Sequence, residues 1–180
     1  MIIFLNGSFG VGKTTVATLL QAALPGSKIY DPELAGSILM RLPKWIALRG
    51  GGTDDFQDID LWRRSVVAGT KLCRLVASGP VIIPMTFSRR DYFDESMQGM
   101  TSVDPHLHVF CLRARVETIT QRLVERGTAV EGPRSEWIIR QIHACAVAHR
   151  DPHFGEPIAT DDRSAADVAA DILSSVAPGA

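Results

Sequence analysis

Five short runs of apolar residues recur along the chain, and segments with helical periodicity separate them. Most of the apolar residues in these runs are consecutive instead of alternating with polar ones, which is typical of strands buried on both faces of a parallel sheet. The pattern therefore predicts an α/β fold of three layers, with a five-stranded parallel sheet flanked by helices. The predicted strands are 2–5, 28–30, 80–85, 107–112 and, more weakly, 157–160.

Two helices are clearest from their apolar stripes. One is predicted within 62–76, with apolar residues on one face and basic residues on the other, and Gly79-Pro80 ends it. The other is predicted within 165–176, where Ser164 and Asp167 have the spacing of a capping box. Two stretches with glycine and proline break the regular alternation. We expect 42–60 to cover the acceptor side of a site and 127–134 to form a lid.

The size and charge of the chain narrow the possible functions. A chain of 180 residues is long enough for one well-buried core and too short for two ordinary domains, so we expect residues 1–180 to form one domain. With 46% apolar and 22% charged residues, the composition is that of a soluble globular protein. The formal net charge of -1 provides no basic field for a nucleic-acid backbone, so no nucleic-acid partner is expected.

The expected location is the cytoplasm. No apolar run approaches the roughly 20 residues that span a bilayer, and the first one has no preceding basic segment. Cys73, Cys111 and Cys145 are odd in number and far apart, which argues against a disulfide framework or a zinc knuckle. Free thiols in a reducing compartment are the expectation.

The strongest chemical signal lies between the first predicted strand and the helix that follows it. Gly7-x4-Gly12-Lys13-Thr14 matches the P-loop pattern in full, in the strand-to-helix context that the pattern requires. Its backbone N–H groups, the helix N-terminus and Lys13 would hold the phosphates of ATP, and the Thr14 hydroxyl would reach Mg²⁺. The expected nucleotide-binding residues are Gly7, Ser8, Phe9, Gly10, Val11, Gly12, Lys13, Thr14 and Thr15.

Among P-loop proteins, the sequence favours a small phosphoryl-transfer kinase. We find no N-K-x-D, which a GTPase uses to read its base, and the chain is smaller than motor-type ATPases. The predicted third strand is followed by Thr86, where an aspartate would be expected to help hold the metal. Kinases of this type catalyse transfer mainly by positioning and charge neutralisation. Their adenine is usually gripped by backbone near the last strand, here around 160–163.

Asp31 ends the second predicted strand. The carboxyl ends of parallel strands form the edge where ligands bind, so Asp31 can act as the general base that takes the proton of an acceptor hydroxyl, or bind the acceptor. Asp31-Pro32-Glu33 also has the composition of a helix start, with Asp31 as N-cap and Pro32 at the first helical position. The sequence leaves both roles open.

Arginines near the predicted lid are candidates for stabilising charge during transfer. Arg122 and Arg126 are four residues apart and therefore share one helical face, which makes them the first choice. Arg113, directly after a predicted strand, comes next. Solvated basic surface is the alternative for each of them.

The acceptor side is less defined. Arg63 beside Trp62 is a candidate for orienting the acceptor. Met85 belongs to a group of apolar residues that either line an acceptor groove or pack in the core; the others are Phe87, Tyr92, Phe93, Met97 and Met100. His149 and His153 are expected on the surface, because Pro152 interrupts a helix and no carboxylate completes a metal site.

The chain as a whole resembles the tunicamycin-resistance proteins, a P-loop family related to nucleotide, shikimate and chloramphenicol kinases. The resemblance runs from residue 1 to about 173 and rests on short motifs in a common order. These are Asp31-Pro32-Glu33, Asp55-Phe56-Gln57, Leu61-Trp62-Arg63, Pro84-Met85-Thr86, Tyr92-Phe93, Arg122-Leu123 with Arg126, and Trp137 with Gln141-Ile142 and Cys145.

The resemblance implies a nucleoside-kinase-like P-loop fold and an ATP-dependent phosphotransferase with Mg²⁺. The implied acceptor is a hydroxyl of tunicamycin, an amphiphilic nucleoside antibiotic, and the implied outcome is resistance. Its relation to chloramphenicol kinases assigns the general base to Asp31, and its motifs add Gln57 and Thr86 to the acceptor-binding candidates Asp31, Arg63 and Met85. Longer relatives continue into a basic extension suited to membrane contact, whereas this sequence ends at Ala180, so membrane contact is not expected.

Two other functions stay open from the sequence. Thr86 in place of an acid favours a protein that binds ATP and sequesters the drug without chemistry, since the metal would be held less firmly. A kinase of a nucleotide or another small metabolite is the third possibility.

Overall fold

The computed structural model describes residues 1–33, 56–127 and 133–176. In these residues five strands form one parallel sheet in the order β2-β3-β1-β4-β5, and six α-helices flank it. The strands are β1 (Ile2–Gly7), β2 (Lys28–Ile29), β3 (Val81–Met85), β4 (Leu107–Arg113) and β5 (Glu156–Ala159). The helices are α1 (Lys13–Ala23), α3 (Asp60–Val76), α4 (Arg90–Val103), α5 (Val116–Glu125), α6 (Pro133–Ala148) and α7 (Ala165–Val176), with short 3-10 turns at Phe56–Asp58 and Pro152–Phe154.

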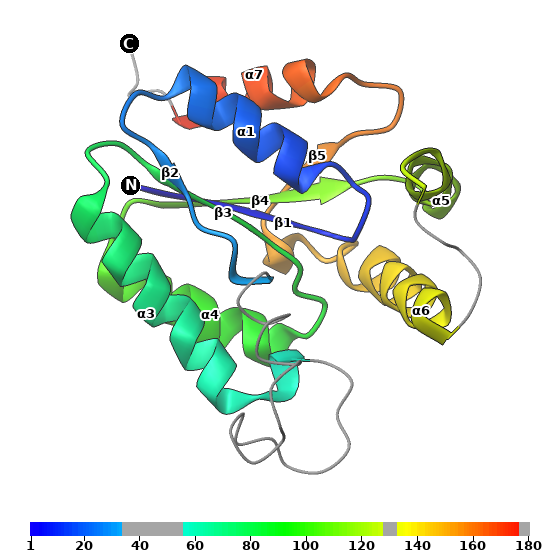
Figure 1. Cartoon of the computed structure of the whole chain (residues 1–180), viewed down its shortest axis with the longest axis horizontal. Helices are drawn as coiled ribbons and strands as arrows, with labels where there is room; N and C mark the ends of the chain where they lie inside the picture. Colours follow the sequence, from blue (N-terminus) through cyan, green and yellow to red (C-terminus); the bar gives the residue numbers. More distant parts are fainter. Residues whose placement is uncertain (34–55, 128–132, 177–180) are drawn as a thin grey trace.

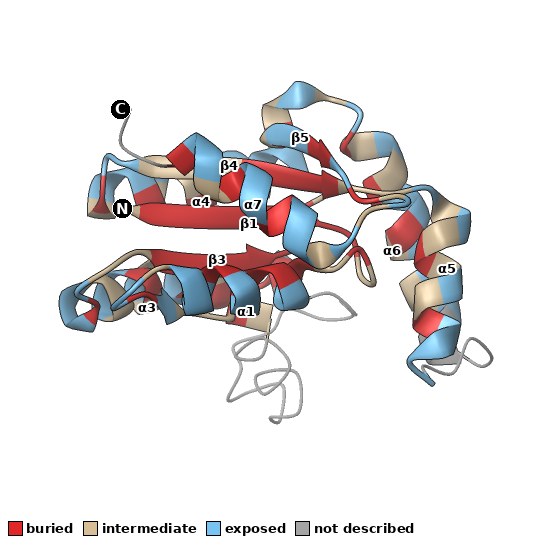
Figure 2. Ribbon diagram, turned by 90° about the horizontal axis from the view of Figure 1, so that it is seen from above, coloured by how far each residue is buried: buried red, intermediate tan, exposed pale blue. Residues whose placement is uncertain are grey.

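The sheet lies between two layers of helices, as the apolar pattern predicts. Helices α1 and α7 cover one face, and α3 and α4 cover the other (Figure 1). The residues of β1 alternate between the two layers: Phe4 packs with the α3–α4 side, whereas Ile3 and Leu5 pack with the α1–α7 side. All of β1 is therefore buried, and in Figure 2 it is red throughout. Burial on both faces explains why this strand has consecutive apolar residues.

The order of the strands places the site. Because β1 lies between β3 and β4 and all three are parallel, their carboxyl ends meet at one edge of the sheet. Helices α5 and α6 stand at this edge (Figure 1). They are joined to each other by a small cluster of Ile119, Leu123 and Ile142. The crevice beyond the strand ends of such a sheet is where ligands bind in open α/β folds.

Most of the predicted elements are confirmed. All five strands lie where the apolar runs predict them, although β2 has only two residues. The capping box of α7 forms, since Ser164 Oγ accepts from the Asp167 N–H and the Asp167 carboxylate accepts from the Ser164 N–H. Among the helices in the described residues, none is long and apolar enough to cross a membrane.

The two expected covers lie largely outside the described residues. Of 42–60, the structure describes the 3-10 turn at Phe56–Asp58 and the start of α3 at Asp60. Of 127–134, residues 128–132 are outside the description, and α6 begins at Pro133.

Candidate active site

The loop between β1 and α1 is built to bind an anion. Gly12 precedes α1 with a φ of +111°, a left-handed conformation that favours glycine. Gly7 passes so close to β4 that an added Cβ would lie 2.9 Å from the carbonyl oxygen of Leu112. No side chain caps the N-terminus of α1, and no acidic residue lies in its first turn. The first N–H groups of this helix and its positive dipole end are therefore left for a ligand such as phosphate.

Lys13 lies at the centre of this loop and is only 7% exposed. Its ammonium donates to the carbonyl oxygens of Gly7 and Ser8, at 2.8 and 3.1 Å, and to Thr86 Oγ1 at 2.9 Å. All three acceptors are neutral. Thr86, which follows β3 in place of the expected acid, therefore contacts the lysine directly and ties the P-loop to β3.

Asp31 and Glu33 bring two carboxylates to the same cavity. A cavity of about 290 Å³ is lined by Lys13 and Thr14 of the P-loop and by Asp31 and Glu33 after β2. Asp31 Oδ1 accepts from the Glu33 N–H at 2.9 Å, where helical structure begins at Pro32. Asp31 thus caps this turn and also lines the P-loop cavity, so its placement is compatible with both roles that the sequence left open.

Glu33 is a residue that the sequence reasoning did not single out. Its Oε1 is buried without a hydrogen-bond partner and lies 4.0 Å from Lys13 Nζ. The cavity thus offers the Thr14 hydroxyl and two carboxylates, which are the hard oxygen donors that Mg²⁺ prefers. Within the described residues, no group of three or more His, Cys, Asp or Glu forms a metal site by itself. This donor set fits a Mg²⁺ ion that is also bound by phosphates and water.

Arg122 and Arg126 lie on the other side of the P-loop. Arg122 donates to Val11 O at 3.3 Å, to Thr160 Oγ1 at 3.1 Å and to Thr160 O at 2.7 Å. A cavity of about 210 Å³ is lined by both arginines and by Thr15 and Thr160. Arg126, which follows α5, also lines the cavity of Lys13 and Asp31. The residues after β5, where the sequence predicts adenine binding, thus meet the P-loop at this cavity.

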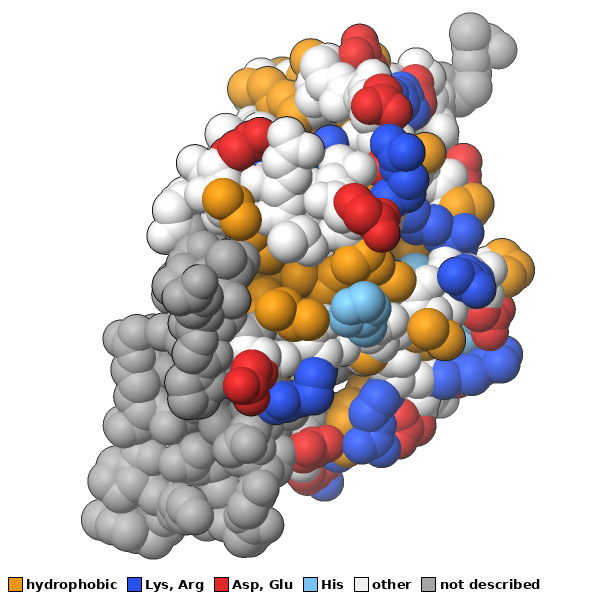
Figure 3. Space-filling view, turned by 90° about the vertical axis from the view of Figure 1, so that its right-hand side faces the viewer, with side chains coloured by type: hydrophobic (Ala, Val, Ile, Leu, Met, Phe, Trp, Pro, Cys, Tyr) orange, Lys and Arg blue, Asp and Glu red, His pale blue; other side chains and the backbone are white. Residues whose placement is uncertain are grey.

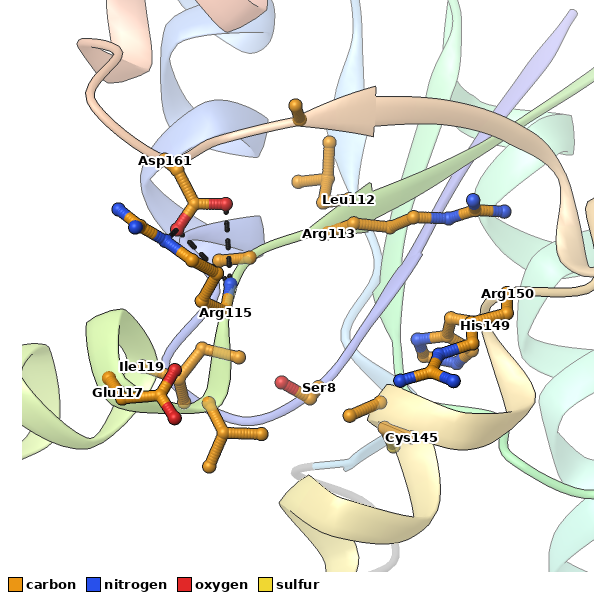
Figure 4. A pocket seen from close by; sticks show the side chains of 14 residues that line it. Ser8, Leu112, Arg113, Arg115, Glu117, Ile119, Cys145, His149, Arg150 and Asp161 are labelled. Carbon is orange, nitrogen blue, oxygen red and sulfur yellow. Dashed lines mark hydrogen bonds and ion pairs between the residues drawn. The ribbon is translucent and has the colours of Figure 1, made fainter.

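Arg113 lies in a different place. It lines a cavity of about 450 Å³ between the ends of β4 and β5 and the helices α5 and α6 (Figure 4). The structure therefore separates Arg113 from the cavity that holds Asp31 and Glu33, although Ser8 lines both cavities.

The acceptor-side candidates are mostly engaged within the protein. Gln57 is buried and donates to the Thr86 carbonyl oxygen at 3.0 Å. Arg63 donates to the Gln57 carbonyl oxygen and to Glu95, and its guanidinium lies over the Tyr92 ring at 4.4 Å. These bonds link the turn at Phe56–Asp58 to α3 and α4.

The structure decides between the two alternatives for Met85 and contradicts the expectation for His149. Met85 does not line an acceptor groove: its side chain is fully buried in the core between β3 and the α3–α4 layer, together with Phe87 and Phe93. His149 is not on the surface but 4% exposed, with Nε2 2.8 Å from Phe87 O. Because a carbonyl only accepts, Nε2 carries the hydrogen. Burial lowers the pKa of His149, and the charges of Lys13 and Arg113 lower it further, so this imidazole is neutral at pH 7.

Figure 3 looks at the end of the molecule where α5 and α6 lie. Hydrophobic side chains gather at the centre of this surface, and basic and acidic side chains lie above them, below them and to their right in the view. Exposed apolar residues of the two helices include Val124, Ile139 and Val147. A ligand at the sheet edge would therefore meet apolar as well as charged groups.

Comparison with solved structures identifies the fold. The tunicamycin resistance protein of Deinococcus radiodurans superposes with a TM-score of 0.73 at 25% sequence identity, covering 99% of this chain and 96% of that one. The resemblance to the tunicamycin-resistance proteins is confirmed. The chain has the P-loop kinase fold. A gluconokinase from Sinorhizobium meliloti (TM-score 0.65, 18% identity, 97% of this chain and 90% of that one) and the shikimate kinase of Acinetobacter baumannii (0.60, 18%, 97% and 92%) share this fold. No family model and no curated protein matches the sequence.

Proposed function

We propose that the protein is an ATP-dependent phosphotransferase that transfers a phosphoryl group to a hydroxyl of tunicamycin and thereby confers resistance. The observation that carries the proposal is the cavity in which Lys13, Thr14 and Asp31 lie together at the carboxyl edge of the sheet. A phosphate-binding lysine and a candidate base that line one cavity are what phosphoryl transfer to a hydroxyl needs. The resemblance to a tunicamycin resistance protein supplies the acceptor.

The chain's own residues would divide the work as follows. The P-loop N–H groups and the N-terminus of α1 hold the phosphates, and the Lys13 ammonium neutralises their charge. Thr14, with Glu33, would hold Mg²⁺, which supplies further charge neutralisation on the phosphates when bound. Arg126 lines both the P-loop cavity and the cavity of Arg122, so it is placed to neutralise charge on the migrating group.

Asp31 is the proposed general base. The acceptor oxygen bonds to the γ-phosphorus, the bond from this phosphorus to the bridging oxygen breaks, and ADP leaves with the electron pair. The Asp31 carboxylate takes the proton that the acceptor hydroxyl loses. The hydrogen bond from the Glu33 N–H fixes the orientation of this carboxylate.

Mass spectrometry of tunicamycin tests the proposal. After incubation of the drug with protein, ATP and Mg²⁺, we expect a gain of about 80 Da, one phosphoryl group, and its loss in Lys13→Ala and Asp31→Asn. Glu156→Gln is the matched control, because this exposed carboxylate lies on β5, the outer strand on the side of the sheet away from β2 and Asp31, and the change should leave the product unchanged.

One observation favours a second function. Thr86 follows β3 at the place where an acidic residue would help to hold the metal, and its hydroxyl accepts a hydrogen bond from Lys13 instead. A metal held less firmly favours a protein that binds ATP and the drug without transferring a phosphoryl group. In that case the drug binds but keeps its mass, and Asp31→Asn retains resistance. Turnover of metabolites in a cell extract, with no change in the drug, would instead indicate a small-metabolite kinase.

A further inference from the structure

The largest cavity described at the sheet edge is not the one that holds Lys13, Thr14 and Asp31. It has about 450 Å³, and its walls are the ends of β4 and β5, the start of α5 and the last turns of α6 (Figure 4). Ser8 lines both cavities, so the two are neighbours across a single residue of the P-loop. The proposed transfer reaction uses none of the other side chains of the larger cavity.

Arg113 is the unusual residue of this cavity. Its Nε and Nη2 atoms are buried, and neither has a hydrogen-bond partner. Within the described part of the chain, no aspartate or glutamate forms an ion pair with it. Arg113 as a whole is half-buried, but its guanidinium stays charged, so burying two of its nitrogens with unsatisfied donors and no counter-charge is costly. An acceptor from outside the chain would remove this cost.

The titratable neighbours of Arg113 do not neutralise it. Burial raises the pKa of the Cys111 thiol more than its contact with Arg113 and the charges of Arg113 and Lys13 lower it, so the thiol is protonated at pH 7 and does not balance the charge of Arg113. His149 is neutral for the reason given above. Arg150, exposed on the same side of the cavity, adds a second positive charge (Figure 4).

The acids of the cavity lie opposite. Asp161 accepts from Arg115 N and Nε and from Thr118 Oγ1, which lower the pKa of its carboxyl more than burial raises it. Its charge is therefore balanced by Arg115. Glu117 is exposed on α5 and lies with Asp161 and Arg115 in Figure 4, on the side away from the guanidinium of Arg113. One end of the cavity is thus positive and unpaired, and the other is neutralised.

We propose that this cavity binds a small molecule through an anionic oxygen group, a carboxylate or a phosphate, that pairs with Arg113. A planar guanidinium binds either group through paired hydrogen bonds, which would satisfy its buried donors. Leu112, Ile119 and Ala146 supply apolar contacts for the carbon part of the molecule. The proposal concerns binding alone, so it is tested without turnover and stands apart from the proposed transfer to tunicamycin.

Thermal unfolding tests it. A saturating non-hydrolysable ATP analogue with Mg²⁺ first occupies the P-loop, and inorganic phosphate is then titrated against chloride at equal ionic strength. We expect phosphate to raise the Tm by about 3 °C at roughly tenfold saturation. The rise should vanish in Arg113→Met and persist in Arg140→Met, a matched change of an exposed arginine on α6. Two pairs of compounds then distinguish a carboxylate ligand from a phosphate ligand. The Tm rise with gluconate is compared with that of uncharged sorbitol, and the rise with glycerol 3-phosphate with that of uncharged glycerol.

The stability of Arg113→Met without added phosphate tests whether the Arg113 guanidinium lacks a partner in the protein. Methionine has a similar length and no charge, so Arg113→Met should leave the Tm of the protein without added phosphate unchanged or higher. A fall of several degrees would show that the guanidinium is already satisfied within the protein, which overturns the proposal. An equal phosphate effect in wild type and Arg113→Met, or no effect beyond chloride in wild type, overturns it as well.

Discussion

Lys13 and Glu33 form an uneven pair of charges. The lysine has three neutral oxygen acceptors, whereas Glu33 Oε1 is buried, has no hydrogen bond and is 4.0 Å from the ammonium. At that separation the attraction is real but does not replace the lost hydration of the carboxylate oxygen. A buried carboxylate oxygen without a hydrogen bond is suited to bind a cation that enters with the nucleotide. Mg²⁺ is the cation favoured by this oxygen together with the Thr14 hydroxyl, since Thr14 lines the same cavity.

Glu33→Gln should therefore separate stability from metal dependence. The amide keeps the shape and removes the charge, so we expect an unchanged or slightly higher Tm, together with a Mg²⁺ requirement for tight ATP binding that rises roughly tenfold. ATP titrations at several Mg²⁺ concentrations, followed by calorimetry, measure the second effect. An ATP affinity that depends on Mg²⁺ as in wild type would remove Glu33 from the metal site.

Asp31→Asn is the informative partner of that change. Asparagine still accepts the hydrogen bond from the Glu33 N–H but cannot take a proton at neutral pH. If Asp31 is the base, turnover falls by about two to four orders of magnitude while the Kd for ATP changes little. A turnover number within a few-fold of wild type would leave Asp31 as a helix cap only.

At the scale of elements, Arg122 joins three parts of the chain. It extends from α5 to the P-loop carbonyl of Val11 and to Thr160 after β5. Arg122→Met should release α5 from both, and we expect the Kd for ATP to rise about tenfold because one wall of the neighbouring cavity loses its anchor. Calorimetric titration measures it, with Arg140→Met as the control that should bind ATP as wild type does. An unchanged Kd would show that this anchor does not contribute to ATP binding.

Asp104 joins the elements at the opposite edge of the sheet. Its carboxylate, at the end of α4, accepts from the amino group of Met1 beside β1 and from Arg74 Nε of α3 at 2.8 Å. Burial raises the pKa of Asp104, but these bonds and that from the His106 N–H outweigh it and hold the pKa well below its usual range. Since the unfolded chain then binds a proton more readily than the folded one, this contribution to stability is present above about pH 4 and is lost as the pH falls further.

Asp104→Asn should lower the free energy of unfolding by about 2 kcal/mol at pH 7 and remove part of the loss of stability between pH 4 and pH 2.5. Urea unfolding across this pH range, for both proteins, measures the two effects together. If the free energies of unfolding of the two proteins differ by the same amount at every pH, Asp104 is not the group responsible for the loss of stability in acid.

At the scale of the molecule, the sequence predicts the sheet well because burial imposes a pattern on it. Strand β1 is buried on both faces and is therefore apolar at consecutive positions, and the P-loop pattern fixes the turn that follows. Contacts between distant elements leave no such pattern. His149 follows α6 directly, yet it is buried because its imidazole packs against Phe154 and contacts the Phe87 carbonyl oxygen; Met85 enters the core rather than a groove because α3 and α4 cover β3. The buried Glu33 oxygen and the two Arg113 nitrogens that lack a hydrogen-bond partner likewise depend on contacts between elements that are distant in the sequence.

The P-loop itself is connected to most of the molecule. Lys13 ties it to β3, Arg122 ties it to α5, and Phe9 packs edge-on against Trp137 of α6, with ring centroids 5.5 Å apart. A nucleotide bound there should stabilise the whole sheet, so a non-hydrolysable ATP analogue at about a hundredfold its Kd should raise the Tm by roughly 5–10 °C.

Lys13→Met should abolish this rise, because the phosphates lose the one full positive charge within the loop, whereas Lys71→Met, an exposed lysine of α3, should keep it. Thermal unfolding with and without the analogue measures both variants. Lys13→Met also leaves Thr86 Oγ1 and the Gly7 and Ser8 carbonyl oxygens without their donor, so its own Tm should be lower than that of wild type. A rise of wild-type size in Lys13→Met would mean that the backbone of the loop alone binds the nucleotide, and the lysine would then act in transfer and not in binding.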